Sequence, residues 1–186
     1  NNHVTITATG KVKAAYGGYA TAADSKAEGN TVTVETGGWV DNNSYAGWAK
    51  GAVNRNIFTV KGHADWSVYG GKLDGSGTAE GNEVRVEGGT VEGHIVGVLG
   101  GANSTVTGNK VTVTGGTVKK NIFGGQSSGA NGKATGNIVA ITNGSTVEGI
   151  VTGGHMTGDG TASDNEITIS GSSTIEKAVY GGYADT

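Results

Sequence analysis

A short phrase of alternating apolar residues recurs seven times along the 186-residue chain, and each copy opens on an asparagine. Two successive copies read NEVRV and NKVTV, and neighbouring copies start 26 to 28 residues apart. The starting residues are Asn2, Asn30, Asn56, Asn82, Asn109, Asn137 and Asn165. A period of this length is typical of solenoid proteins, in which each repeat is one structural unit that packs on its neighbours.

Each repeat places aliphatic residues at fixed positions. The second and fourth residues after each asparagine are Val, Ile or Phe in every copy, which puts both on one face of a β-strand. A third column follows the next glycine-rich turn, with Val12, Val40, Val91, Val118, Val147 and Ile175, and with Ala64 as the nearest candidate in the third repeat. One short unit cannot bury such a face alone, whereas stacked units can.

The 37 glycines exclude helices, because no run without glycine exceeds ten residues. A glycine costs a helix interior about 1 kcal/mol relative to alanine, and isolated helices shorter than ~12–15 residues are marginal. We therefore predict an all-β chain, a parallel β-solenoid (β-helix) of about seven coils that forms a single domain over residues 1–186. Since parallel crossovers are right-handed by default, we expect a right-handed coil.

The asparagine column and the glycine pairs have a structural interpretation. Stacked identical amides can hydrogen-bond along the axis of stacked sheets, so the seven asparagines predict a structural ladder. Asparagine also tolerates the left-handed backbone that a tight corner needs. The Gly-Gly pairs suit corners that no side chain could enter.

The sequence offers little for catalysis or for metal binding. The four histidines occupy four different places in the repeat, with no metal-ligand spacing, and there is no cysteine. Only two arginines occur and no outer column of paired carboxylates, so the convergent groups of an enzyme are missing. We expect no catalytic residues, no metal and no cofactor.

One alternative stays open, calcium binding in the turns. The stretch LDGSGTAEGNE offers oxygen ligands at alternate positions, although it lacks the terminal bidentate acid of an EF-hand. Its candidate residues are Asp74, Ser76, Thr78, Glu80 and Asn82, and a second turn offers Asp159 and Asp164.

Charge and hydropathy exclude two classes of partner. The net charge of −3 is scattered along the chain, without the basic stripe that nucleic-acid binding requires. No apolar run approaches the ~18–20 residues of a membrane-spanning helix, so this segment is not expected to insert into a membrane.

The aromatic residues are the best candidates for ligand contact. Trp39, Trp48, Trp66, Tyr45 and Tyr69 gather in the second and third repeats. The residues before the glycine pairs form a column of Tyr16, Tyr45, Tyr69, Leu99, Phe123, Thr152 and Tyr180, whose tolerance of threonine favours an outward orientation. An outer aromatic column is either a contact surface for sugar or protein or a ladder that shields a corner, and the sequence leaves both open.

Two stretches, GNKVTVTGGTVKKNIFGG and ISGSSTIEKAVYGGYA, resemble the glycine-rich β-helical repeats in passenger regions of bacterial autotransporter adhesins. The resemblance implies a secreted, extracellular rod at the cell surface, anchored to the outer membrane through a region outside this segment. It implies no cofactor and no enzyme activity, and contacts with host or bacterial surface proteins or glycans.

Neither end of the chain carries a recognisable cap, so we expect a section of a longer rod. The alternative is a structural rod or filament subunit that self-associates head-to-tail through open solenoid ends.

Overall fold

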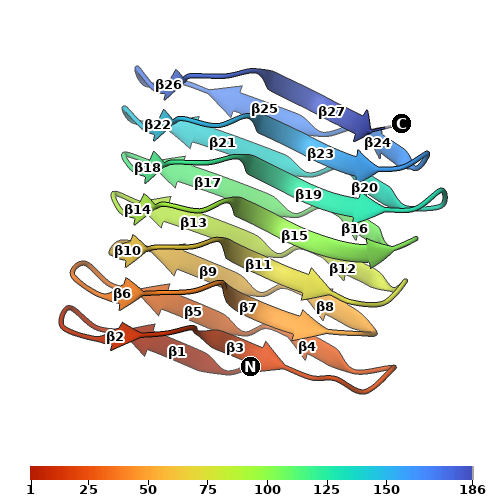
Figure 1. Cartoon of the computed structure of the whole chain (residues 1–186), viewed down its shortest axis with the longest axis horizontal. Helices are drawn as coiled ribbons and strands as arrows, with labels where there is room; N and C mark the ends of the chain where they lie inside the picture. Colours follow the sequence, from red (N-terminus) through yellow and green to blue (C-terminus); the bar gives the residue numbers. More distant parts are fainter. Residues whose placement is uncertain (186) are drawn as a thin grey trace.

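The computed structural model describes residues 1–185, and within them the chain winds into a solenoid of seven coils made of parallel β-strands (Figure 1). This confirms the predicted all-β fold class. Each coil starts at one of the seven asparagines, and the coils are numbered one to seven from Asn2 onward. None of the described residues, 1–185, forms a helix of the length and hydrophobicity that crossing a bilayer requires.

The strands form four parallel sheets, called here A to D in the order in which a coil visits them. Sheet A contains β1 (His3–Ile6), β5 (Thr31–Val34), β9 (Ile57–Val60), β13 (Glu83–Glu87), β17 (Lys110–Thr114), β21 (Ile138–Thr142) and β25 (Glu166–Ile169). Sheet B contains β2 (Lys11–Val12), β6 (Trp39–Val40), β10 (His63–Ala64), β14 (Thr90–Val91), β18 (Thr117–Val118), β22 (Thr146–Val147) and β26 (Thr174–Ile175).

The other two sheets complete each coil. Sheet C contains β3 (Tyr16–Tyr19), β7 (Ser44–Ala49), β11 (Val68–Leu73), β15 (Ile95–Ala102), β19 (Ile122–Ser128), β23 (Val151–Thr157) and β27 (Val179–Asp185). Sheet D contains β4 (Lys26–Glu28), β8 (Ala52–Asn54), β12 (Thr78–Glu80), β16 (Thr105–Thr107), β20 (Lys133–Thr135) and β24 (Thr161–Ser163).

The aliphatic columns stack in register and form the core. Val84 lies beside Val111, and Val111 beside Val139, so equivalent residues of successive coils are direct neighbours in sheet A. In the third column Ala64 stands between Val40 and Val91, as the sequence suggested. The inward residues of sheets A, B and C form one buried cluster, and those on the sheet D side form a second.

The glycine pairs that follow the aromatic column lie inside the strands of sheet C rather than at corners, which corrects the sequence-based interpretation for these pairs. The other pairs do lie in turns, between sheets A and B, and the first glycine of each has a positive φ angle; they are Gly37–Gly38, Gly88–Gly89 and Gly115–Gly116. A Cβ atom on Gly47 would lie 2.5 Å from Asn56 Nδ2, and one on Gly125 would lie 2.7 Å from Asn137 Nδ2. Neither glycine has a positive φ angle. These glycines are therefore required because a side chain would collide with the asparagine column.

The left-handed backbone also lies elsewhere than predicted. The residue before each asparagine of coils two to seven has a positive φ angle, whereas the asparagines of the column do not. Glycine fills this position in four coils, but Arg55 has a φ of 53° and Asp164 a φ of 57°. The turn therefore requires a positive φ angle at the residue before the asparagine. The asparagine itself keeps an ordinary backbone conformation, and its side chain forms the ladder.

Candidate functional site

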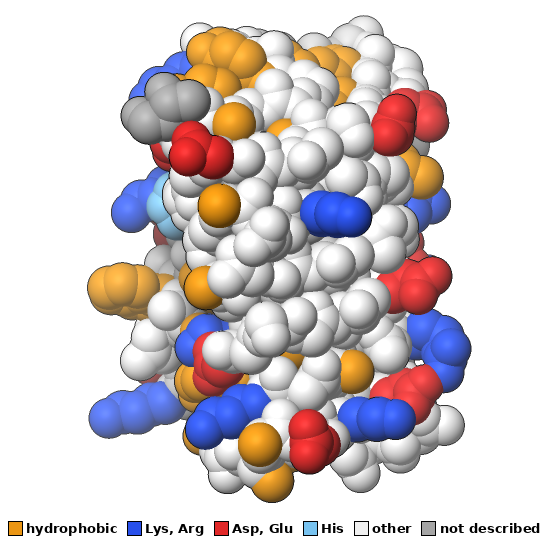
Figure 2. Space-filling view, turned by 90° about the vertical axis from the view of Figure 1, so that its right-hand side faces the viewer, with side chains coloured by type: hydrophobic (Ala, Val, Ile, Leu, Met, Phe, Trp, Pro, Cys, Tyr) orange, Lys and Arg blue, Asp and Glu red, His pale blue; other side chains and the backbone are white. Residues whose placement is uncertain are grey.

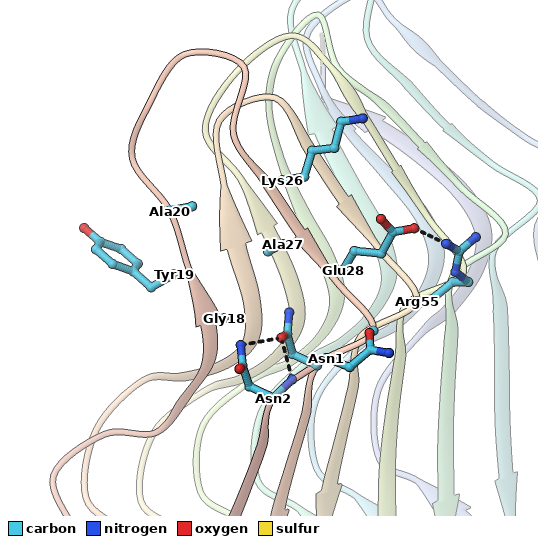
Figure 3. A pocket seen from close by; sticks show the side chains of 11 residues that line it. Asn1, Asn2, Gly18, Tyr19, Ala20, Lys26, Ala27, Glu28 and Arg55 are labelled. Carbon is cyan, nitrogen blue, oxygen red and sulfur yellow. Dashed lines mark hydrogen bonds and ion pairs between the residues drawn. The ribbon is translucent and has the colours of Figure 1, made fainter.

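The asparagine column forms a continuous hydrogen-bonded ladder along the solenoid axis. Each Nδ2 group donates to the Oδ1 atom of the asparagine in the next coil, at 2.8 to 3.0 Å. The same Oδ1 atom accepts the backbone N–H of the preceding asparagine at 2.9 to 3.1 Å. Figure 3 shows the first of these steps, between Asn2 and the unlabelled Asn30.

The ladder amides of coils three to six, Asn56, Asn82, Asn109 and Asn137, have no capacity left for a ligand. Asn109 is fully buried, and its Oδ1 atom accepts two hydrogen bonds from Asn82. Its Nδ2 group donates to Asn137 Oδ1 and to the carbonyl oxygen of Ala79. Because an amide offers two donors and an acceptor with two lone pairs, every group of this side chain is paired internally.

The outer face of sheet C carries two parallel columns of side chains. The first column contains Tyr16, Tyr45, Tyr69, Val96, Phe123, Thr152 and Tyr180. The second contains Tyr19, Trp48, Lys72, Leu99, Gln126, His155 and Tyr183. Both columns face outward, because the residues that directly precede the first column, such as Val68 and Ile122, lie in the core cluster.

The predicted place of Leu99 was wrong. Leu99 pairs with Lys72 and Gln126 and so belongs to the second column, while Val96 takes the place in the first. Coil four reads IVGVLGG, and the sequence comparison aligned its later glycine pair, Gly100 and Gly101, with the pairs of the other coils.

Coils one to three carry an aromatic cluster on this face, made of Tyr16, Tyr19, Tyr45, Trp48 and Tyr69. The rings of Tyr45 and Tyr69 stack with centroids 4.6 Å apart, and those of Tyr16 and Tyr45 at 5.5 Å. Trp48 and Tyr19 meet edge to face at 5.0 Å. Tyr19 is 58% exposed and Tyr16 42% exposed, so the cluster presents aromatic surface to solvent.

Polar groups fix Trp48 within this cluster. Its indole Nε1 donates to Asp74 Oδ2 at 2.6 Å, and Lys72 Nζ lies 3.7 Å from the ring centroid. Lys72 also pairs with Asp74 at 3.2 Å. Burial is the main cause that raises the pKa of the Tyr45 hydroxyl, and the nearby Tyr69 raises it further, so this side chain stays neutral.

The five predicted contact residues lie in three separate places. Tyr45, Tyr69 and Trp48 belong to the aromatic cluster. Trp39 lies in β6 of sheet B, where it stacks on His63 at 4.0 Å and donates its Nε1 hydrogen to Asp65. Trp66 lies in the turn between β10 and β11 and is 57% exposed. Sequence reasoning left Tyr19 out of the candidate set, although it pairs with Trp48 in the register of sheet C.

A hollow of about 510 Å³ lies beside Trp66 and is lined by His94 and Lys120 among others. His94 Nδ1 accepts the backbone N–H of Asn121 at 3.2 Å. Burial, and after it the positive charge of Lys120, lowers the pKa of His94 below its usual value. The ring is therefore kept in its neutral form.

A second, larger hollow of about 790 Å³ lies at the open side of coil one (Figure 3). Its wall includes Ala27, the ladder residues Asn2 and Asn30, and the ion pair between Glu28 and Arg55. The side chains that line it are those of a sheet edge and a ladder end. We assign it no chemistry of its own.

The described residues contain no cluster of histidine and acidic side chains suited to a metal ion. Within residues 1–185 no three histidine or acidic side chains are grouped so as to hold a metal ion. Two of the calcium candidates are already engaged, since Asn82 belongs to the ladder and Asp74 binds Trp48 and Lys72.

Charges of both signs lie interspersed on the face shown in Figure 2, and most of that surface is uncharged and polar. Comparison of the chain with protein-family models, with curated proteins and with solved structures found no match. The fold defines the class, a parallel β-solenoid of seven coils with an internal asparagine ladder and aromatic columns on one outer face.

Proposed function

We propose that this chain is a non-enzymatic segment of a surface-displayed rod, which extends from a bacterial cell and contacts a host, a neighbouring cell or a glycan. The rod is secreted and is anchored to the outer membrane through a region outside residues 1–186. The resemblance of its repeats to autotransporter passenger repeats supports this location.

The observation that carries the proposal is the aromatic cluster of coils one to three. Exposed tyrosine and tryptophan rings are enriched at contact surfaces, because they supply large apolar area together with a polar group. Trp48 is held in place by Asp74, so its ring is preorganised and loses little freedom on binding. A stiff ladder behind the cluster keeps the rings at a fixed spacing.

Binding of the purified chain to bacterial cells, host cells and a glycan array tests the proposal. The variant Tyr19→Ser removes the most exposed ring of the cluster and is expected to weaken binding, with the melting temperature unchanged. Trp66→Ser is the matched control, because it removes an equally exposed ring from a different place. Equal binding by Tyr19→Ser and the parent, or hydrolysis of a polysaccharide by the parent, contradicts the proposal.

A second candidate is a structural rod that assembles head-to-tail. It is supported by the exposed apolar residues of the last coil, Ile169 and Val179, which continue columns that are buried in the middle coils. Light scattering over a range of concentrations tests it. Linear growth that Val4→Lys with Val179→Lys suppresses supports assembly, and a monomer at all concentrations contradicts it.

A further inference from the structure

Three tyrosines of the first column of sheet C stand on successive strands. Tyr16, Tyr45 and Tyr69 are register partners on β3, β7 and β11. The rings of Tyr45 and Tyr69 stack with centroids 4.6 Å apart and with 16° between their planes. Those of Tyr16 and Tyr45 stack at 5.5 Å and 20°. The sheet therefore holds phenol rings face to face along the axis, and the closest pair connects coils two and three.

The oxidisable side chains at the surface of this chain are aromatic. The chain has no cysteine, and its one methionine, Met156, is fully buried. These two residue types are common targets of protein oxidation when solvent reaches them. Tyr16 is 42% exposed and Tyr69 is partly exposed, whereas Tyr45 between them is buried. An oxidant in solution therefore meets the two ends of the tyrosine stack.

Stacked phenols have the geometry that oxidative coupling requires. When a phenol loses one electron and its hydroxyl proton, the unpaired electron spreads onto the ring carbons beside the oxygen. It occupies p orbitals perpendicular to the ring. In two parallel stacked rings these orbitals point at each other, so two such radicals can form a carbon–carbon bond. In an edge-to-face pair the orbitals of one ring meet the hydrogen atoms of the other ring instead.

We propose that Tyr45 and Tyr69 are a site of oxidative cross-linking, where a one-electron oxidant of the haem peroxidase class, supplied with hydrogen peroxide, joins coils two and three. Each tyrosine gives one electron to the oxidant and one proton to water, and a bond forms between the two Cε atoms. The hydrogens on these two carbons then move to the oxygens, which restores both phenols as dityrosine. The pair loses two hydrogen atoms in total, and one hydrogen peroxide becomes two waters.

The buried ring of Tyr45 is oxidised through its neighbour. Tyr16 is exposed and stacks on Tyr45, so a radical formed at Tyr16 passes to Tyr45 by electron transfer between rings in contact. Tyr69 is oxidised directly, because it is partly exposed. The two radicals then meet in the pair with the shortest centroid distance and the most nearly parallel planes.

Two other tyrosine pairs are more exposed but less well oriented. Tyr16 and Tyr19 meet edge to face, with 66° between their planes and centroids 5.8 Å apart. Tyr180 and Tyr183 are tilted by 44°, and they are 38% and 41% exposed. If exposure decided the coupling, these pairs would react first. If stacking decides it, they stay unlinked.

The bond would act as a covalent staple in a chain that has no disulfide. It joins residues one repeat apart in sequence, so it constrains the unfolded chain as a disulfide does. This inference concerns a modification of the chain and stands whether or not the rod is an adhesin.

The test treats the dilute, folded chain with a haem peroxidase and hydrogen peroxide and measures dityrosine fluorescence. Tryptic mass mapping then locates the bond, because Lys50, Arg55 and Lys61 separate Tyr45 and Tyr69 into different peptides. We expect these two peptides to be joined with the loss of two hydrogen atoms.

The variant Tyr45→Phe keeps the ring but removes the hydroxyl, and Phe123 occupies the same column in coil five. It should lose the intramolecular fluorescence, because no stacked pair of phenols remains. Tyr183→Phe is the matched control and should cross-link as the parent does. If Tyr45→Phe does not fold, Tyr69→Phe replaces it and should lose the joined peptides.

Three results overturn the proposal. They are no intramolecular cross-link in the parent, a cross-link mapped to any other tyrosine pair, or an unchanged yield of the joined peptides in the folded phenylalanine variant of the pair.

Discussion

Replacing Asn109 by alanine is expected to destabilise the middle of the solenoid strongly. The substitution removes four hydrogen bonds at once, two accepted from Asn82 and two donated to Ala79 and Asn137. The backbone N–H of Asn82 loses its acceptor, and the site is fully buried, so water cannot replace it. A buried donor without an acceptor costs about 1–3 kcal/mol.

The magnitude follows from the count of bonds. A hydrogen bond contributes about 1 kcal/mol net, so four bonds give a loss of about 4 kcal/mol in the free energy of unfolding. The loss is limited because Asn82 Nδ2 keeps its bond to the carbonyl oxygen of Val53, and Asn137 Oδ1 keeps the one from the backbone N–H of residue 109. For a domain of this size each kcal/mol lowers the melting temperature by about 2–4 °C, so we expect a decrease of about 8–16 °C.

Urea denaturation followed by far-ultraviolet circular dichroism and by tryptophan fluorescence measures this loss. Asn131→Ala is the matched control, because Asn131 is exposed and only its backbone N–H is bonded, to Asn103; a surface change of this kind stays within about 0.5 kcal/mol. A loss below about 1 kcal/mol for Asn109→Ala would refute this reasoning, because it would show that the ladder adds little to stability.

Three further predictions concern packing and protonation. Gly47→Ala places a Cβ atom 2.5 Å from Asn56 Nδ2 and should lower the melting temperature, and the loss should be less than additive with Asn56→Ala; strict additivity would show that the two sites do not touch. Val113→Asp puts a carboxylate in a fully buried column and should abolish cooperative unfolding, whereas melting near the parent would mean that the strand faces are assigned backwards. Since the pKa of His94 is lowered in the folded state, the unfolded chain binds the proton first, and stability should decrease as pH falls below about 6.5. The variant His94→Gln should lack that part of the pH dependence. Identical pH profiles of the unfolding free energy for the variant and the parent would refute this prediction.

The sequence was sufficient for the parts of the fold that depend on local alternation. Every coil carries apolar residues two and four positions after its asparagine, as Val111 and Val113 follow Asn109. Only parallel stacking in register buries such columns together. The same periodicity places the asparagines one above another.

The features that the sequence could not predict depend on contacts between coils. Gly47 looks like a turn glycine, yet it is needed because Asn56 of the next coil occupies the space of a side chain. The second column of sheet C has no shared chemistry, since Tyr19, Trp48 and Lys72 are successive members, so Tyr19 carried no signal until the register was known.

The most direct test of the account is the register of the stacked coils. The chain contains no cysteine, so pairs can be introduced without background. Thr112 and Ala140 are neighbours in sheet A, and their Cα atoms should lie about 4.8 Å apart, within the range of a disulfide. Thr112 and Thr168 are two coils apart, at about 9.6 Å.

Under mild oxidation, the variant Thr112→Cys with Ala140→Cys is predicted to form an intramolecular disulfide, seen as a faster band in non-reducing electrophoresis and confirmed by peptide mass mapping. The variants Thr112→Cys with Thr168→Cys and Thr112→Cys with Thr142→Cys, the second shifted by two residues, should stay reduced. A disulfide in either of these, or none in the first, would contradict the in-register solenoid.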